Sequence, residues 1–136
     1  MTPELTHVVV VNDNPDFLEL MADLLQDERY PTTVINGDRE NAVELIRGAS
    51  PDAMIIDLRL GRDDLHGWDV LQEVRADPEL RDLPTLICTG DTRALQEMAD
   101  EISGMRRVDS ITKPFSIDEL LSKLEALLER ETPRAS

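Results

Sequence analysis

The 136-residue sequence is short of cysteine, of basic residues and of long apolar runs. One cysteine, Cys88, cannot form an internal disulfide, and one thiol with two histidines cannot complete a Cys/His zinc site. No apolar run exceeds four residues, so we expect no membrane span, no export signal and a cytoplasmic location. Lys and Arg total 14 against 29 Asp and Glu, a net charge of -15 that disfavours direct binding to nucleic acid or anionic lipid.

The composition is nevertheless that of a folded chain. Hydrophobic residues make up 40 % of the sequence, and the 6 glycines bring the apolar share close to that of globular proteins. The length suits one domain with a core of its own. No Pro/Gly/Ser linker, repeat or low-complexity tract divides the chain. We therefore expect a single domain over residues 1–136, with a frayed tail at 132–136.

Short apolar runs alternate with stretches that carry apolar residues at helical spacing, and the runs predict strands at 8–11, 31–35, 53–56, 84–88 and about 108–111. Helices should follow each strand. Asn14 caps the first, which reaches about residue 28; Asp38 caps the second, and Gly48 ends it. A third helix surrounds 68–74, a fourth 95–102, and the last starts at Ser116 with Glu119 completing a capping box. This alternation predicts an α/β fold with a parallel sheet and helices on both faces.

In such sheets, ligands bind at the carboxyl ends of the strands. The residues found there are Asn12, Asp13 and Asn14, then Asp57, then Thr89, Gly90 and Asp91, and finally Thr112 and Lys113. Asp13 and Asp57 would lie side by side if their strands are neighbours, and a divalent cation such as Mg2+ would relieve their repulsion. With the Lys113 amine and the Thr89 hydroxyl, this set suits phosphoryl transfer, which needs positioning and charge neutralisation.

Each of these residues also has a structural interpretation. The Asn12–Asn14 cluster can supply turn and cap oxygens, Asp57 can be a solvated loop acid, and Lys113 can be a surface lysine. Either interpretation holds for any one residue taken alone. Their joint occurrence at four strand ends favours the site.

Four ordered motifs resemble the receiver domain of bacterial two-component response regulators over residue 8 to about residue 128. They are VVVVNDNPD at 8–16, PDAMIIDLRL at 51–60, LICTG at 86–90 and TKPF at 112–115. The resemblance implies a three-layer α/β/α fold in which a five-stranded parallel sheet has the flavodoxin-like, doubly wound order 2-1-3-4-5.

The resemblance also implies roles for the residues at the strand ends. Asp57 resembles the acceptor that attacks a phosphohistidine of a histidine kinase or phosphotransfer protein. Mg2+ would be bound by Asp13, by Asp57 and by the backbone carbonyl of Arg59, and through a water by Asn12.

Three further positions would hold the incoming phosphoryl oxygens. Thr89 and the Gly90 amide would bind some of them, and Lys113 another. The missing side chain of Gly90 would let the backbone approach the phosphoryl group. A cis Lys113-Pro114 bond is expected, which would turn the amine into the crevice.

The chain departs from the family pattern at several places. Asn12 stands where a second acid is usual, and Ser110 where many receivers carry an aromatic switch residue. The loop after Asp57 has Gly61 where proline is common, and it is two residues longer by our interpretation. Arg59 and Asp91 could pair across the crevice and slow hydrolysis of the acyl phosphate, or point apart into solvent.

The function implied is that of a phosphoacceptor signalling module of a phosphorelay. Such a module catalyses its own phosphorylation and dephosphorylation without being a turnover enzyme, and it would signal to a downstream protein or to an output domain absent from this chain. The alternative, motivated by Asn12 and Ser110, is a degenerate receiver that only docks proteins. A flavin-binding protein of similar fold fits poorly, because the chain has no Ser/Thr/Gly phosphate loop after the first strand. A hydrolase of similar fold fits poorly as well, because it would need a second acid two residues after Asp57, where Arg59 stands.

Overall fold

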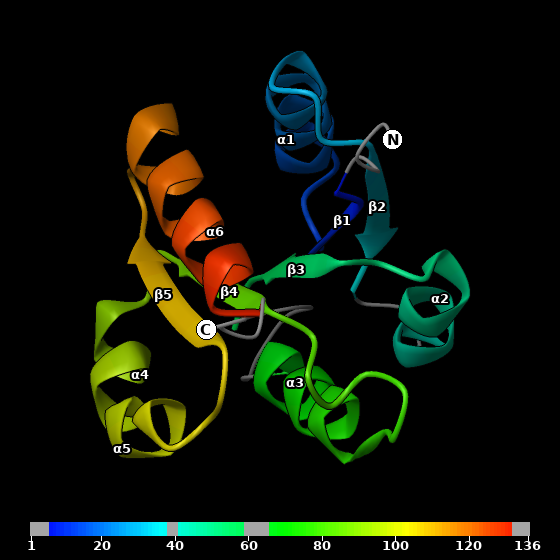
Figure 1. Cartoon of the computed structure of the whole chain (residues 1–136). Coiled ribbons are helices and arrows are strands. Elements are labelled where there is room, and N and C mark those ends of the chain that lie inside the picture. Colours follow the sequence, from blue (N-terminus) through cyan, green and yellow to red (C-terminus); the bar gives the residue numbers. More distant parts are fainter. Residues whose placement is uncertain (1–5, 38–40, 59–65, 132–136) are drawn as a thin grey trace, which may run out of the picture.

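The computed structural model describes residues 6–37, 41–58 and 66–131. Within them the elements follow one another as expected, strand after helix (Figure 1). In chain order they are β1 (Val8–Asn12), α1 (Pro15–Asp27), β2 (Thr32–Asn36), α2 (Ala42–Ala49), β3 (Ala53–Ile56), α3 (His66–Ala76), β4 (Thr85–Thr89), α4 (Thr92–Glu97), α5 (Ala99–Ser103), β5 (Val108–Thr112) and α6 (Ile117–Glu131). No helix in these ranges is long and apolar enough to cross a membrane.

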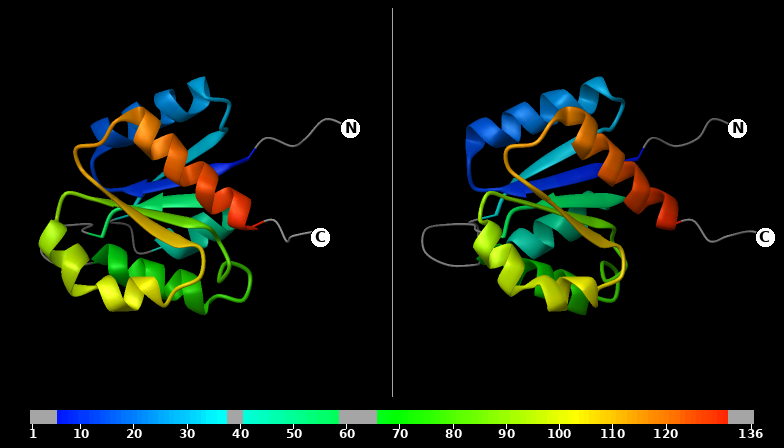
Figure 2. Two further views of the ribbon diagram at one scale, coloured as in Figure 1. Left: turned by 60° about the vertical axis from the view of Figure 1, so that its left-hand side comes forward. Right: turned by 90° about the vertical axis from the view of Figure 1, so that its left-hand side faces the viewer.

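The five strands form one parallel sheet with the order β2-β1-β3-β4-β5, which confirms the expected topology. Figure 2 shows the strands running in one direction between two layers of helices. β1 lies beside β3, with Val11 opposite Ile56, so the residues that follow these two strands come out at the same edge. The carboxyl ends of β4 and β5 meet in the same way, with Thr89 opposite Thr112.

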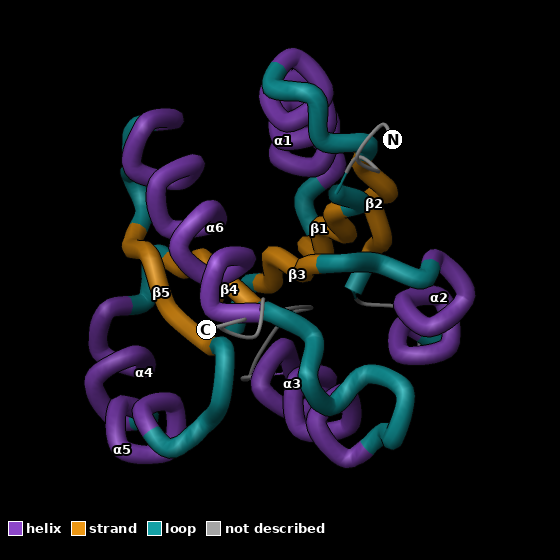
Figure 3. The backbone as a smooth tube through the Cα atoms, in the orientation of Figure 1, coloured by secondary structure: helices purple, strands orange, loops and turns teal. Residues whose placement is uncertain are grey.

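The sheet separates two apolar cores. α1 and α6 cover one face, and α2, α3, α4 and α5 cover the other (Figure 3). Val8 and Val10 point into the first core, and Val9 and Val11 into the second, all of them at most 1 % exposed. Burial on both faces explains why this strand is a continuous apolar run rather than an alternating one.

The helix caps were predicted with mixed success. The Asn14 side chain accepts hydrogen bonds from the first turn of α1, and Ser116 Oγ accepts one from the Glu119 N–H at 3.0 Å, as expected. The second helix does not end at Gly48: it continues to Ala49, and Ser50 leaves it in the left-handed region at φ 50°. The Asp38 cap and the tail at 132–136 lie outside the described residues.

The fourth helix was expected as one element and is two short ones. The break is at Met98, whose N–H donates to the carbonyls of Ala94 and Gln96 and whose ψ of 6° departs from the helix. The apolar stripe continues across the break, and Leu95, Met98 and Ile102 all pack on the same core. An apolar period reports which face is buried and does not show whether the backbone is continuous.

Candidate functional site

A buried carboxylate marks the carboxyl edge of the sheet. Asp57 follows β3, is 9 % exposed, and donates its backbone N–H to the Val11 carbonyl at 3.3 Å. Its Oδ2 accepts a hydrogen bond from Lys113 Nζ at 2.8 Å and one from Asn12 Nδ2 at 3.4 Å. A buried charge of this kind needs such partners, because desolvation without them is unfavourable by several kcal/mol. The structure thus brings together three of the residues expected at the site.

Asn12 is buried between Asp57 and the first turn of α1. Its Oδ1 accepts the Asn14 N–H at 2.9 Å, which turns Nδ2 towards Asp57. Asn14 Oδ1 in turn accepts the N–H groups of Asp16 at 2.9 Å and Phe17 at 3.2 Å. The amide nitrogen of Asn12 therefore donates to the Asp57 carboxylate, while the amide oxygen accepts the N–H at the start of the helix.

The Thr89 side chain, at the end of β4, is 1 % exposed. Its Oγ1 accepts the Asp91 N–H at 3.1 Å, and its backbone carbonyl accepts the Lys113 N–H at 2.9 Å. Gly90 beside it is exposed, and a Cβ built there would meet only the Lys113 Cβ, at 3.9 Å. Internal packing does not require glycine at this position, so the space above its backbone is open.

Asp91 has a structural role that its sequence position did not reveal. Its Oδ1 accepts the Ala94 N–H at 2.9 Å and caps α4. Its expected partner, Arg59, lies outside the described residues, as do Gly61 and the rest of 59–65. Both the Arg59 carbonyl as a metal ligand and the Arg59–Asp91 pair therefore stay predictions.

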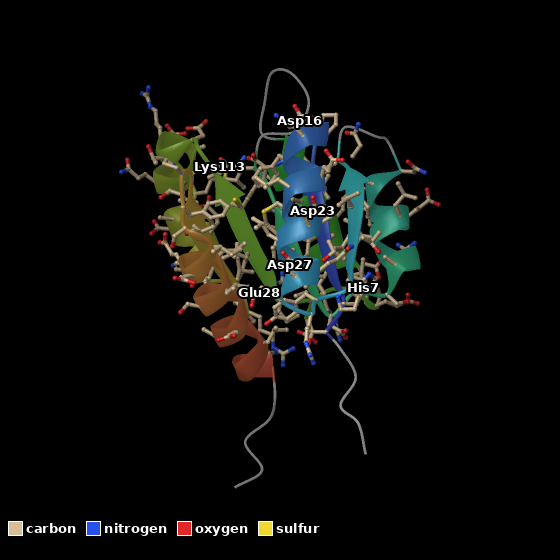
Figure 4. All side chains as sticks on the ribbon, turned by 90° about the horizontal axis from the view of Figure 1, so that it is seen from above. His7, Asp16, Asp23, Asp27, Glu28 and Lys113 are labelled. Atoms are coloured by element: carbon tan, nitrogen blue, oxygen red, sulfur yellow. The ribbon has the colours of Figure 1, made fainter. Side chains whose placement is uncertain are left out.

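Lys113 reaches Asp57 from the loop that follows β5. The Lys113-Pro114 bond is cis, as predicted, and the lysine side chain is 30 % exposed. Its Nζ also lies 4.4 Å from the centroid of the Phe17 ring. Figure 4 shows Lys113 at the end of α1 that carries Asp16, with His7 at the opposite end of the molecule. The sequence alone gives no sign of this contact, because Phe17 and Lys113 are 96 positions apart in the chain.

Gly67 fixes the return of the chain after Asp57. A Cβ at Gly67 would lie 1.8 Å from the Asp57 carbonyl oxygen, so no other residue fits without moving the backbone. The Gly67 N–H donates to the Leu58 carbonyl at 2.8 Å. The start of α3 is therefore joined directly to the segment that contains Asp57.

The donor set suits a magnesium ion with a large share of water ligands. Asp57 and the half-buried Asp13 follow neighbouring strands and offer the carboxylate oxygens that Mg2+ prefers. Among the described residues, no group of three or more His, Cys, Asp or Glu gathers, and position 12 beside Asp57 carries an amide. One or two carboxylates are the usual protein contribution to a magnesium site, so the residues fit the ion.

Cys88 and Ser110 lie on the strands that lead to the site, and neither offers a reactive group to it. Burial raises the pKa of the Cys88 thiol to about 12; the nearby Lys113 lowers it and Asp57 raises it by smaller amounts. The thiol is therefore neutral and unreactive at physiological pH. Ser110, half-buried on β5 opposite Ile87, donates its backbone N–H to Asp109 Oδ1 at 2.8 Å.

The chain matches the sequence profile of the response regulator receiver domain over residues 8–125, and it belongs to this family. It is 36 % identical over 125 residues to the probable transcriptional regulatory protein TcrX of Mycobacterium tuberculosis, a match that covers 90 % of this chain and 50 % of TcrX. The chain spans about half the length of the curated relatives that it matches.

Solved structures agree on the fold. The chemotaxis response regulator CheY4 of Vibrio cholerae has a TM-score of 0.76 at 22 % identity, over 91 % of this chain and 99 % of that chain. The receiver domain of the sensor histidine kinase PA1611 from Pseudomonas aeruginosa PAO1 has a TM-score of 0.71 at 26 % identity, over 93 % and 99 %. That structure has a magnesium ion coordinated in its active site cleft. Family membership sets aside the flavin-binding and hydrolase interpretations.

Proposed function

We propose that residues 1–136 form one receiver module that takes a phosphoryl group onto Asp57 from a phosphohistidine of a histidine kinase or phosphotransfer protein. The observation that carries this proposal is the buried Asp57 carboxylate with the Lys113 ammonium 2.8 Å away, at the carboxyl edge of a parallel sheet. Ligands bind at this edge in folds of this type. The module promotes its own phosphorylation and dephosphorylation and is not a turnover enzyme.

In the transfer step, a carboxylate oxygen of Asp57 forms a bond to phosphorus while the P–N bond to the imidazole breaks. The electron pair of that bond stays on the imidazole nitrogen, which then takes up a proton. Lys113 stays close enough to exchange a carboxylate oxygen for a phosphoryl oxygen, and Thr89 and the Gly90 amide hold the others. These groups act by positioning and by neutralising charge, which is the main requirement of phosphoryl transfer.

A magnesium ion would be held by the carboxylates of Asp13 and Asp57 and by the carbonyl of Arg59, with Asn12 reached through a water. The ion supplies positive charge that neutralises the phosphoryl oxygens and the two carboxylates during transfer. Because Asn12 is neutral, this site has one negative charge fewer than a site with an acid at position 12.

The test is the intact mass of the protein after incubation with acetyl phosphate, with Mg2+ or with excess chelator. We expect a gain of one phosphoryl group that needs Mg2+ and disappears in Asp57→Ala. Asp23→Asn, a change of an exposed acid on α1, should be labelled like the wild type. Labelling of Asp57→Ala would overturn the assignment of the acceptor, and an unlabelled wild type would favour the docking-only alternative.

The lifetime of the acyl phosphate would depend on Arg59 and Asp91. A pair across the mouth of the crevice would hinder the attacking water, more by steric occlusion than by charge, because exposed ion pairs contribute only about 0.2–1 kcal/mol. Dephosphorylation rates of Arg59→Ala, Asp91→Asn and the double variant decide this. Asparagine keeps the cap of α4. A gating pair predicts that each single change speeds hydrolysis and that the double change adds little; additive effects would exclude it.

The output of the module would pass through protein contacts to a downstream partner or to an output domain outside this chain. Relatives of about twice its length carry names such as DNA-binding response regulator MtrA, of Mycolicibacterium smegmatis. With a net charge of -15, this chain is poorly suited to bind DNA itself. Any binding to DNA would therefore belong to another domain or protein.

A further inference from the structure

The ammonium of Lys113 lies between two partners from different parts of the fold. One is Asp57 Oδ2, 2.8 Å from Nζ, and the other is the ring of Phe17 on α1, whose centroid is 4.4 Å from Nζ. Among the side chains that the structure describes, those of residues 6–37, 41–58 and 67–128, this is the one cation–π contact. Attraction between a cation and a ring face acts within about 6 Å of the centroid, so the contact is well inside its range.

The ring is held from two sides. The Phe17 backbone N–H donates to Asn14 Oδ1, and the Asn14 backbone N–H donates to Asn12 Oδ1. The side-chain amide nitrogen of Asn12 in turn donates to Asp57. The half-buried ring packs against the core between the sheet, α1 and α6. The cap of α1, the acceptor and the lysine therefore form a closed chain of contacts, and the ring cannot move far without disturbing the cap.

We propose that Phe17 is a positioning residue that keeps the Lys113 ammonium over the site during phosphoryl transfer. The ring attracts the cation without offering an oxygen, so all three N–H donors stay available to Asp57 and to the incoming phosphoryl group. A carboxylate at position 17 would compete for these donors, and a leucine would exclude water without attracting the charge. The aromatic face allows Nζ to move between carboxylate and phosphoryl oxygens while it remains in place.

This role rests on the proposed function, and its test separates the two. Phenylalanine at position 17 is replaced with analogues that carry one, two or three ring fluorines, which keep the shape and weaken the quadrupole step by step. The rate of phosphorylation by acetyl phosphate is measured with saturating Mg2+. We expect the rate to fall with each fluorine, to about two- to fivefold below the wild type for three, as follows from cation–π strengths at partly exposed sites.

The matched control is the other phenylalanine of the chain. Phe115 packs against the same core, and the same analogues at that position should leave the rate within experimental error. Phe17→Tyr, which keeps an electron-rich ring, should retain the rate, and Phe17→Leu should lose at least as much as trifluorination. A merely structural role predicts no dependence on fluorine number, because the analogues fill nearly the same volume.

Proton NMR gives a readout without phosphorylation. The Phe17 ring current should shift the Lys113 ε-methylene protons upfield, and Phe17→Leu should abolish that shift. A flat fluorine series in a wild-type background that is phosphorylated, or an unshifted Lys113 resonance, overturns the role of Phe17. If the wild type accepts no phosphoryl group, every variant is equally silent, which overturns the proposed function and this role with it.

Discussion

The two ends of the sheet each hold a charged side chain that is at least partly withdrawn from water, and they stabilise it differently. At the carboxyl end, the charge of Asp57 faces the opposite charge of Lys113. At the amino end, Arg75 of α3 donates through Nη1 to the carbonyl of Arg81 and through Nη2 to that of Arg106, the latter at 2.8 Å. These carbonyls belong to the loops that lead into β4 and β5.

The partners of Arg75 are neutral and fixed. Burial lowers the pKa of Arg75; Asp82 counteracts this, while Arg107 and Arg106 lower it further. Its Nε is buried and meets no hydrogen-bond acceptor among the described residues. Arg75 therefore ties two loops together and has no partner to exchange. Lys113 is bound to a side chain and can exchange Asp57 for another anion during a reaction. Arg75 is bound to backbone carbonyls, so its role is to stabilise the fold.

The comparison predicts its largest effect at Lys113. Lys113→Met keeps the length of the side chain and removes the charge, so the phosphoryl oxygens lose a fixed cation. We expect the rate of phosphorylation by acetyl phosphate to fall by about 10²- to 10³-fold, the range found when a preorganised donor is removed from an active site. Lys123→Met, on α6, should leave the rate unchanged. A rate within a factor of two of the wild type would show that the ammonium does not serve the chemistry.

At Arg75 we expect a loss of stability without a loss of phosphorylation. Arg75→Met leaves the carbonyls of Arg81 and Arg106 without this donor, and we expect the free energy of unfolding in urea to fall by about 1–3 kcal/mol. Phosphorylation should be unaffected while the protein is folded. Arg93→Met, at a side chain that is 88 % exposed, should change stability by less than about 0.5 kcal/mol. Equal stability losses in the two variants would remove the distinction drawn between the two ends.

A substitution at Asn12 tests how the number of negative charges at the carboxyl end controls Mg2+ affinity. Asn12→Asp adds a carboxylate beside Asp57 and removes the amide that donates to it. We expect Mg2+ affinity to rise about tenfold, because the affinity of an oxygen site grows with its negative charge. Isothermal titration calorimetry measures this. Gln26→Glu, which adds the same charge at the exposed C-terminal end of α1, away from the carboxyl edge of the sheet, is the control and should change affinity by less than twofold.

Cys88 is expected to produce the smallest effect. Its folded-state pKa of about 12 lies above the ordinary value of 9.0, so between these values the unfolded chain has released the thiol proton and the folded chain has kept it. Stability from this group is therefore complete below pH 9 and falls as the pH rises. Between pH 7.5 and 10, the wild type should lose about 1 kcal/mol more than Cys88→Ala in urea unfolding. If the wild type and Cys88→Ala lose the same free energy of unfolding over this pH range, the pKa of Cys88 is not raised in the folded protein.

The fold and the meeting of Asp57 with Lys113 could be predicted because both depend on patterns along the chain. Runs such as Val8–Val11 are apolar throughout, which indicates strands buried on two faces, and alternation with helices fixes a parallel sheet. Parallel strands bring their carboxyl ends to one edge, so Asp57 and Lys113 could be placed together from their positions alone.

What the sequence did not reveal depends on contacts across the fold. The Phe17 ring meets Lys113 from a distant helix, and Arg75 meets two loops that follow it in the chain. Such contacts require the direction of a side chain as well as its position. The break at Met98 was missed because the apolar stripe passes through it unchanged.

The close contact between Gly67 and Asp57 makes the position of Asp57 independent of how many residues lie between Leu58 and Gly67. The Gly67 N–H binds the Leu58 carbonyl, so the segment between them begins and ends at one hydrogen bond. Residues can be added between the two ends with little effect on them, since doubling the length of a connection changes the closure free energy by only about 0.6 kcal/mol. The chain can therefore vary in length between Leu58 and Gly67 while Asp57 keeps its place at the end of β3.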